Sequence, residues 1–210
     1  MYRLIEAFGL MLLLCLGVVA QNAPDDGEYR KNEYYVGYSN QQVDDFDRTT
    51  FNGFEVSYTR NVTRWIGIRG SVSGAYRNRD FRGTFSNPNG GTAVIEQENN
   101  RSVYNFLGGV QIKDNASRKR FKPFGFAMVG VAHNRSRFKD SACVSGSCPA
   151  NPPIDVTFSD TGFAGSFGGG LDIKINDRVD FRAIQVDYNP IYSNSRVDNN
   201  VRFGIGFVFK

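Results

Sequence analysis

The strict alternation of apolar with small or polar residues at the end of the chain constrains the fold most. From residue 201 onward every second residue is large and apolar, and the residues between them are mostly glycine or charged. The apolar positions are Val201, Phe203, Ile205, Phe207 and Phe209. Because successive side chains of a β-strand point to opposite faces, this segment predicts a strand with one apolar face and one small, polar face. The apolar face suits lipid, and the other suits a packed polar lumen.

Other segments of the chain show the same alternation. They are residues 51–60, 65–76, 103–113 and 161–175. In each of them large aliphatic and aromatic residues on one face oppose small, polar or charged residues on the other. The segments are long enough to cross a bilayer, since a tilted strand needs about ten residues to cross the hydrocarbon core. They therefore predict membrane-spanning strands.

Three further segments predict strands whose facing the sequence leaves open. Residues 33–39 are short, residues 121–134 are apolar on both faces, and residues 179–188 change character partway. A shift of one residue would exchange the lipid and lumen faces along a whole strand. Arg182 and Asp187 are therefore left unassigned.

Long polar stretches and short links alternate between these segments. The long stretches are residues 40–50, 77–101, 139–160 and 189–199, and the short links lie near residues 61–64, 114–120 and 176–178. Outer-membrane barrels have short periplasmic turns and longer extracellular loops, and closure removes the exposed edges of a sheet. The pattern predicts an all-β fold, an eight-stranded antiparallel up-and-down transmembrane β-barrel with short periplasmic turns, longer extracellular loops and both ends in the periplasm.

The N-terminal residues predict export. An apolar stretch ends in Gly-Val-Val-Ala at residue 20 and is followed by polar residues. It is shorter than the roughly 20 residues of a transmembrane helix and ends in the small residues of a cleavage site. We therefore expect residues 1–20 to be a signal peptide, residues 21–32 to be an N-terminal periplasmic segment, and residues 33–210 to be the barrel domain in the bacterial outer membrane.

Cys143 and Cys148 lie in a polar, Pro-rich stretch and flank Val-Ser-Gly-Ser. An exported protein reaches an oxidising compartment, so we expect a local disulfide between them. Paired thiolates could instead bind a metal, but the short gap and the lack of a nearby histidine disfavour such a site. The sequence predicts no metal site and no cofactor site.

Several segments resemble the OmpA-like outer-membrane β-barrel superfamily. They are Lys-Pro-Phe-Gly-Phe-Ala-Met-Val-Gly-Val-Ala from residue 122, Phe-Arg-Ala-Ile-Gln-Val-Asp-Tyr from residue 181, and Phe-Gly-Ile-Gly-Phe-Val-Phe from residue 203. The resemblance covers essentially the mature chain, and its motifs are architectural rather than catalytic. It implies insertion by the barrel-insertion machinery, which reads a terminal aromatic residue in this family. Here Phe209 is penultimate and Lys210 is last.

The predicted inward faces carry charges of both signs. These residues are Glu55, Arg69, Asp172, Lys174 and Arg202. Side chains can fill the interior of an eight-stranded barrel, and unpaired buried charge is costly, so we expect these groups to pair in a structural network. A small ion path through the lumen is the alternative. The short turn near Val62 predicts that Glu55 and Arg69 are cross-strand neighbours.

Two predicted outer loops carry basic residues. Arg77, Arg79 and Arg82 lie in one, and Arg135, Arg137 and Lys139 begin the other. They could face the phosphates of lipopolysaccharide or an unidentified surface ligand, or they could be ordinary solvated residues. We expect outer-membrane lipid and lipopolysaccharide as partners. We expect no nucleic acid, because the sequence contains no recognisable module that binds it.

These patterns define function only coarsely. We expect a noncatalytic outer-membrane barrel that contributes to envelope integrity or presents surface loops for adhesion. The alternative is a soluble exported barrel that encloses a hydrophobic ligand, as lipocalins do, with its apolar faces turned inward. A lipid-modifying outer-membrane enzyme is the third possibility. It would use His133 and Ser136, but these residues point to opposite faces of an extended strand, so no catalytic residue is assigned.

Overall fold

The computed structural model describes residues 29–43, 49–86, 92–146, 154–193 and 195–210. The expected signal peptide (residues 1–20) and most of the expected periplasmic segment (residues 21–32) lie outside these residues and stay predictions. Within the described ranges, no helix has the length and apolar character needed to cross a membrane.

The described residues form eight β-strands that close into one antiparallel barrel. The strands are β1 (Asn32–Val43), β2 (Thr49–Asn61), β3 (Ile66–Ser86), β4 (Thr92–Lys113), β5 (Phe121–Gly146), β6 (Ile154–Lys174), β7 (Val179–Ser193) and β8 (Arg196–Phe209). Each strand pairs with the next along the chain, and β1 pairs with β8. The short links β2–β3, β4–β5 and β6–β7 lie at one end of the barrel, the turn end; the opposite end is the hairpin end. The predicted fold is confirmed.

The strand faces agree with the alternation in the sequence. In β8, Ile205 and Phe207 are 44% and 45% exposed, whereas Arg202 and Val208 are each 1% exposed. The outward side chains of the other strands are also large and apolar, among them Tyr34, Val36, Val56, Ile68, Val72, Phe106, Val110, Val129, Val131 and Phe163. Such a belt faces acyl chains. The alternative of a soluble ligand-enclosing barrel, which needs these faces inside, is therefore wrong.

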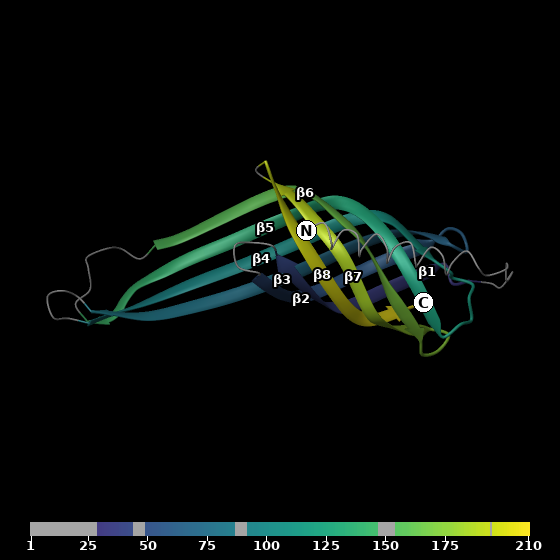
Figure 1. Cartoon of the computed structure of the whole chain (residues 1–210), viewed down its shortest axis with the longest axis horizontal. Helices are drawn as coiled ribbons and strands as arrows, with labels where there is room; N and C mark the ends of the chain where they lie inside the picture. The colour runs from purple at the N-terminus through teal and green to yellow at the C-terminus, as the bar shows by residue number, and fades with distance from the viewer. Residues whose placement is uncertain (1–28, 44–48, 87–91, 147–153, 194) are drawn as a thin grey trace, which may run out of the picture.

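The long polar stretches are largely paired strands rather than irregular loops. β3 and β4 remain paired until Ser86 meets Thr92, and β5 and β6 remain paired until Asp140 meets Ile154. These two hairpins are joined through β4 and β5 and reach well beyond the other strands (Figure 1). We call this four-stranded part, made of the described residues within 77–101 and 134–161, the sheet extension. Its sequence is polar because the strands have left the lipid, while their hydrogen-bond ladder continues.

A bulge in β7 explains why the facing of this strand could not be read from the sequence. Between Arg182 and Gln185 the strand advances three residues while β8 advances two. Arg182 is buried before the bulge, and Gln185 and Asp187 are buried after it, so the inward positions change from even to odd numbers. The extra residue of a bulge shifts the alternation by one position, so side chains after it point to the opposite face from the one that the earlier alternation predicts. Arg182 and Asp187, which were left unassigned, both point into the lumen.

Glycines of β6 leave room inside the barrel for aromatic rings of β5. Phe124 pairs with Gly170, and Phe126 pairs with Gly168. A Cβ atom on Gly170 would lie 2.8 Å from the ring of Phe124 and 2.1 Å from the carbonyl oxygen of Ile184. The run of glycines at residues 168–170 is therefore explained by close packing.

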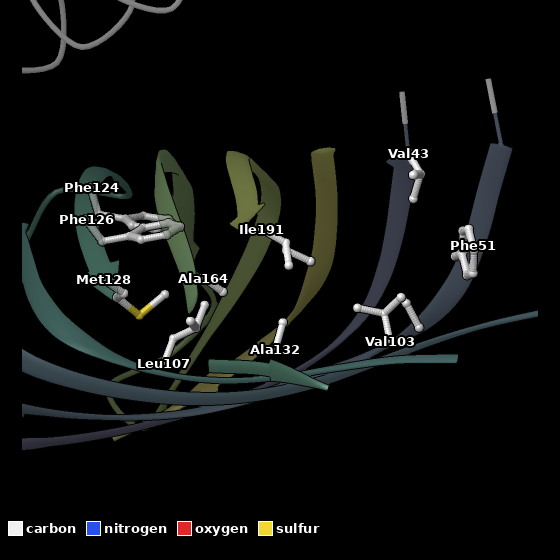
Figure 2. Packing of buried hydrophobic residues seen from close by; sticks show 11 residues of the cluster. Val43, Phe51, Val103, Leu107, Phe124, Phe126, Met128, Ala132, Ala164 and Ile191 are labelled. Atoms are coloured by element: carbon white, nitrogen blue, oxygen red, sulfur yellow. The ribbon is translucent and has the colours of Figure 1, made fainter. Parts of the chain in front are cut away.

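The buried apolar side chains form one cluster (Figure 2). Phe124 and Phe126, near the start of β5, lie toward the turn end of the barrel. Val43 and Phe51, which flank the β1–β2 link, lie toward the hairpin end. The apolar cluster thus extends along the barrel, and buried charged and polar side chains share the lumen with it.

Candidate functional site

The middle of the lumen is organised around the carboxylate of Glu55. Glu55 accepts a hydrogen bond from Arg69 Nη2 at 2.8 Å and another from Gln185 Nε2 at 2.9 Å. The Nη2 atom of Arg202 lies 3.7 Å from the second carboxylate oxygen. All four side chains are buried. One buried carboxylate thus lies between two guanidinium groups.

A second cluster lies toward the turn end and is centred on Asp172. Arg182 Nε donates to this carboxylate at 2.8 Å, and Lys113 Nζ donates to it at 3.2 Å. Lys113 also donates to Glu33 at 2.6 Å. Arg182 Nη1 donates to Gln185 Oε1 at 2.9 Å, which links this cluster to the one around Glu55.

A third cluster lies toward the hairpin end and joins Arg202 to Asp187. Arg202 Nη2 lies 2.9 Å from Asp187 Oδ2, and Arg202 Nη1 donates to Ser73 Oγ at 2.7 Å. Ser166 Oγ donates to Asp187 at 2.8 Å. Because Arg202 also faces Glu55, the three clusters form one chain of alternating charges, which we call the lumen network.

Aromatic rings pack against the arginines of the lumen network. The guanidinium carbon of Arg182 lies 3.9 Å from the ring centroid of Phe124 and 4.4 Å from that of Tyr35. The guanidinium carbon of Arg69 lies 4.5 Å from the ring centroid of Phe126. Such contacts favour a cation that has lost its water shell. The side chains in the lumen therefore compensate one another's charge and fill the space between the strands.

The predicted lumen charges join the network with one exception. Those that join it are Glu55, Arg69, Asp172 and Arg202. Lys174 does not: its side chain is 28% exposed, and its Nζ atom lies 2.5 Å from Asp177 Oδ1 in the β6–β7 turn. Its position is the last of β6, so its flexible side chain reaches the turn and water. The prediction for Lys174 is wrong.

Glu55 and Arg69 form an ion pair from neighbouring strands, but they are not directly opposite one another. The register pairs Arg69 with Thr59 and Glu55 with Ser73. The long arginine side chain spans this offset inside the lumen. Sequence reasoning missed Lys113, although it continues the inward alternation of residues 103–113 and could have been found from that signal.

The basic residues predicted for the outer loops lie in the sheet extension and do not form one patch. Strand alternation places Arg77 and Arg79 on its inner face, and Arg82, Arg135, Arg137 and Lys139 on its outer face. Arg82 Nε lies 3.2 Å from Glu96, and Arg137 Nη2 lies 2.5 Å from Asp155. The hydrogen bond from Arg137 holds the pKa of Asp155 below its ordinary value. Acidic residues thus interrupt the basic cluster.

His133 and Ser136 do not form a catalytic pair. His133 Nδ1 lies 2.8 Å from Thr161 Oγ1 on the neighbouring strand, whereas Ser136 lies on the other face of β5. No carboxylate hydrogen-bonds His133 in the part of the chain that the structure describes. A nucleophile, a base and an orienting carboxylate are therefore not assembled at this position.

The predicted disulfide stays a prediction. Cys148 lies outside the described residues, and only the backbone of Cys143, in β5, is described. Across the described ranges, no group of three or more His, Cys, Asp and Glu side chains is placed to hold a metal ion.

A cavity of about 310 Å³ lies at the hairpin end, and no motif in the sequence predicts it. Its apolar lining includes Val43, Phe51 and Ile191. Its polar lining includes the amide side chains of Gln41, Asn134 and Asn200. We call it the outer cavity. Every strand except β3 contributes to its lining, so no single segment of sequence could predict it.

Comparison with known proteins identifies relatives of this barrel. A family model described as the outer membrane protein beta-barrel domain matches residues 11–210. No curated protein sequence matches the chain significantly. A solved structure of Ail, the attachment invasion locus protein of Yersinia pestis, in complex with the heparin analogue sucrose octasulfate, is similar with 14% identity and a TM-score of 0.55. The match covers 86% of this chain and 100% of the Ail chain.

A second crystal structure of Ail matches with 14% identity and a TM-score of 0.50, over 85% of this chain and 97% of that chain. Neisserial surface protein A matches with 9% identity and a TM-score of 0.48, over 87% and 99% of the two chains. At these identities the structural likeness to Ail concerns the fold alone.

Proposed function

This chain belongs to the outer membrane protein beta-barrel domain family, and from that premise we propose that it is a noncatalytic adhesin that displays the sheet extension on the cell surface. It lies in the bacterial outer membrane, with the turn end in the periplasm and the hairpin end outside the cell. The observation that carries the proposal is the length of the paired strands beyond the lipid.

The sheet extension is longer than membrane insertion requires. β3 continues for ten residues, Arg77 to Ser86, after Tyr76. At about 3.3 Å per residue, these residues reach roughly 33 Å further. Hydrogen bonds to β4 hold them along this length, so the membrane barrel supports a protruding and ordered surface.

Both outer edges of the sheet extension lack a neighbouring strand among the described residues. The pairing of β2 with β3 ends where Asn52 meets Tyr76, and the pairing of β6 with β7 ends where Phe163 meets Tyr192. Beyond these points the backbone groups on the outer side of β3 and β6 are available to a strand from another protein. This arrangement supports a polypeptide as the adhesion partner.

The charges of the sheet extension support the same class of partner. Its residues with described side chains include seven Lys and Arg and five Asp and Glu; basic residues predominate on β3 and β5, and acidic residues predominate on β4 and β6. A mixed surface of this kind creates no strong field of one sign. Ail is described in complex with a heparin analogue, so a sulfated polysaccharide is the competing partner class for this barrel.

Removal of most of the sheet extension should strongly reduce attachment and leave the barrel intact. In the trimmed variant, an Asn-Gly turn replaces residues 79–99 and another replaces residues 138–156, each closing a register-matched hairpin. We expect attachment of the expressing bacteria to serum-protein-coated wells to fall about tenfold or more, since a tenfold loss of binding needs only about 1.4 kcal/mol. Heat-modifiable mobility on gels should be retained, because the lumen network is untouched.

The same trimmed cells separate adhesion from a role in envelope integrity. Their resistance to detergent should equal that of cells with the full chain. Unchanged attachment, or detergent sensitivity that appears on trimming, would contradict an adhesin and favour the envelope role. Soluble heparin that blocks attachment of the full chain as well as trimming does would overturn a polypeptide partner.

A further inference from the structure

We propose that the outer cavity binds one ring of an uncharged saccharide from outside the cell. The cavity lies in the mouth of the barrel at the base of the sheet extension, whose residues 101, 134–136 and 158–160 contribute to its lining. The adhesion proposal does not depend on this base. Three properties support this ligand class: amide atoms without hydrogen-bond partners among the described residues, charges of both signs, and an apolar wall.

The amide side chains in the outer cavity need partners that both donate and accept hydrogen bonds. Gln41 is buried, and neither Nε2 nor Oε1 has a hydrogen-bond partner among the described residues. The same holds for Asn134 Oδ1 and Asn200 Oδ1. Asn200 Nδ2 donates to the carbonyl oxygen of Asn189 at 3.0 Å, which fixes the orientation of its amide. Buried amides without partners are costly, and hydroxyl groups, which donate and accept, satisfy both ends of an amide.

Charges of both signs around the outer cavity disfavour a simple ion. Arg101 lies in its lining with its guanidinium carbon 5.8 Å from the ring centroid of Phe51, and Asp160 and Asp198 also line it. An anion would meet two carboxylates, and a cation would meet a guanidinium. An uncharged ligand with several hydroxyl groups avoids both repulsions and can hydrogen-bond to either kind of group.

The apolar wall and the size of the outer cavity fit a sugar ring. Val43, Phe51 and Ile191 are buried and form its apolar side. A pyranose ring carries C–H groups on its faces and hydroxyl groups around its rim, so one face can pack on the apolar side of the cavity while the rim meets the amides. An acyl chain would satisfy the apolar side alone and leave the amides unpaired. The volume of about 310 Å³ is at the low end for ligand pockets, which suits one ring rather than a long oligosaccharide.

Binding can be tested with methyl β-D-glucopyranoside on the full chain in lipid nanodiscs. The NMR signals of the side-chain amides of Gln41, Asn134 and Asn200 should shift and saturate as the glycoside is added. Gln41→Met keeps the length of the side chain and removes its amide, so the dissociation constant should rise about tenfold or more. The variant should keep heat-modifiable mobility, because the lost amide has no partner among the described residues.

Gln42→Met is the matched control, since Gln42 is the next residue of β1 and is exposed on the outer face. It should bind the glycoside as the parent does. Sodium sulfate and sodium decanoate represent an anion and an acyl chain, and neither should give saturating shifts. The proposal is overturned by glycoside shifts that do not saturate, by equal binding to Gln41→Met, or by tighter binding of sulfate or decanoate.

Failure of the saccharide proposal and failure of the adhesion proposal are distinguishable. The trimmed variant keeps all the residues that line the outer cavity, since these lie within residues 41–51, 101–103, 134–136, 158–160 and 191–200. It should therefore bind the glycoside like the full chain even where attachment is lost. Loss of glycoside binding on trimming would contradict a site within the barrel mouth.

Discussion

Replacing Glu55 with alanine should lower the free energy of unfolding of the barrel by about 3–5 kcal/mol. The Glu55 carboxylate is buried and lies 2.8 Å from Arg69 and 3.7 Å from Arg202. Glu55→Ala leaves both guanidinium groups in the lumen with less negative charge to compensate them, and a buried charge without its partner is strongly destabilising. Urea unfolding in lipid vesicles, followed by the heat-modifiable shift on gels, measures the loss.

Glu96→Ala is the matched control for this prediction. Glu96 also pairs with an arginine, since Arg82 Nε lies 3.2 Å away, but the two side chains are 40% and 69% exposed. An exposed pair contributes about 0–1 kcal/mol. If Glu55→Ala destabilises the barrel no more than Glu96→Ala does, the lumen network does not hold the barrel together.

A second variant tests whether the loss comes from uncompensated charge. Glu55→Ala combined with Arg69→Met removes one of the two guanidinium groups and keeps apolar volume beside Phe126. The double variant should be more stable than Glu55→Ala alone, because fewer charges are left without partners. A strictly additive loss would instead assign the effect of Glu55 to packing.

The fold could be predicted because lipid forces a period of two on each strand. In β8 the outward Ile205 and Phe207 alternate with glycines and with Arg202, so both faces are visible in the sequence. The alternation of apolar and polar residues does not show the facing of a strand where the lumen itself is apolar. Phe124 and Phe126 of β5 are buried and fill space left by glycines of β6. A strand that is apolar on both faces does not show which face is inside.

The lumen network could be predicted only in part, because alternation gives the face of a residue and not its partner. Arg69 was placed correctly inside, but one of its hydrogen bonds goes to Gln185, 116 residues away on β7. The β7 bulge places Arg182 and Asp187 on the same side despite their spacing, and nothing in the sequence marks it. The alternation of β6 places Lys174 at an inward position, but its flexible side chain turns toward water and pairs with Asp177.

Replacing Ile205 with arginine should destabilise the barrel in the membrane by about 2–4 kcal/mol. Ile205 is 44% exposed on the outer surface and lies in the middle of the apolar run that ends at Phe209. A guanidinium group at this depth meets hydrocarbon, where neither water nor an acidic side chain compensates its charge. The expected result is a lower urea midpoint in vesicles and slower insertion from the unfolded state.

Phe81→Arg separates the effect of lipid from that of the substitution itself. Phe81 lies in the part of β3 that belongs to the sheet extension and is 58% exposed, more than Ile205. If its surroundings are water, the arginine should change the free energy of unfolding by less than about 0.5 kcal/mol. A larger loss in the free energy of unfolding at Ile205 than at Phe81 then shows that Ile205 faces hydrocarbon and Phe81 faces water. Equal losses at Phe81 and Ile205 would place both residues in the same solvent, and the sheet extension would not stand outside the membrane.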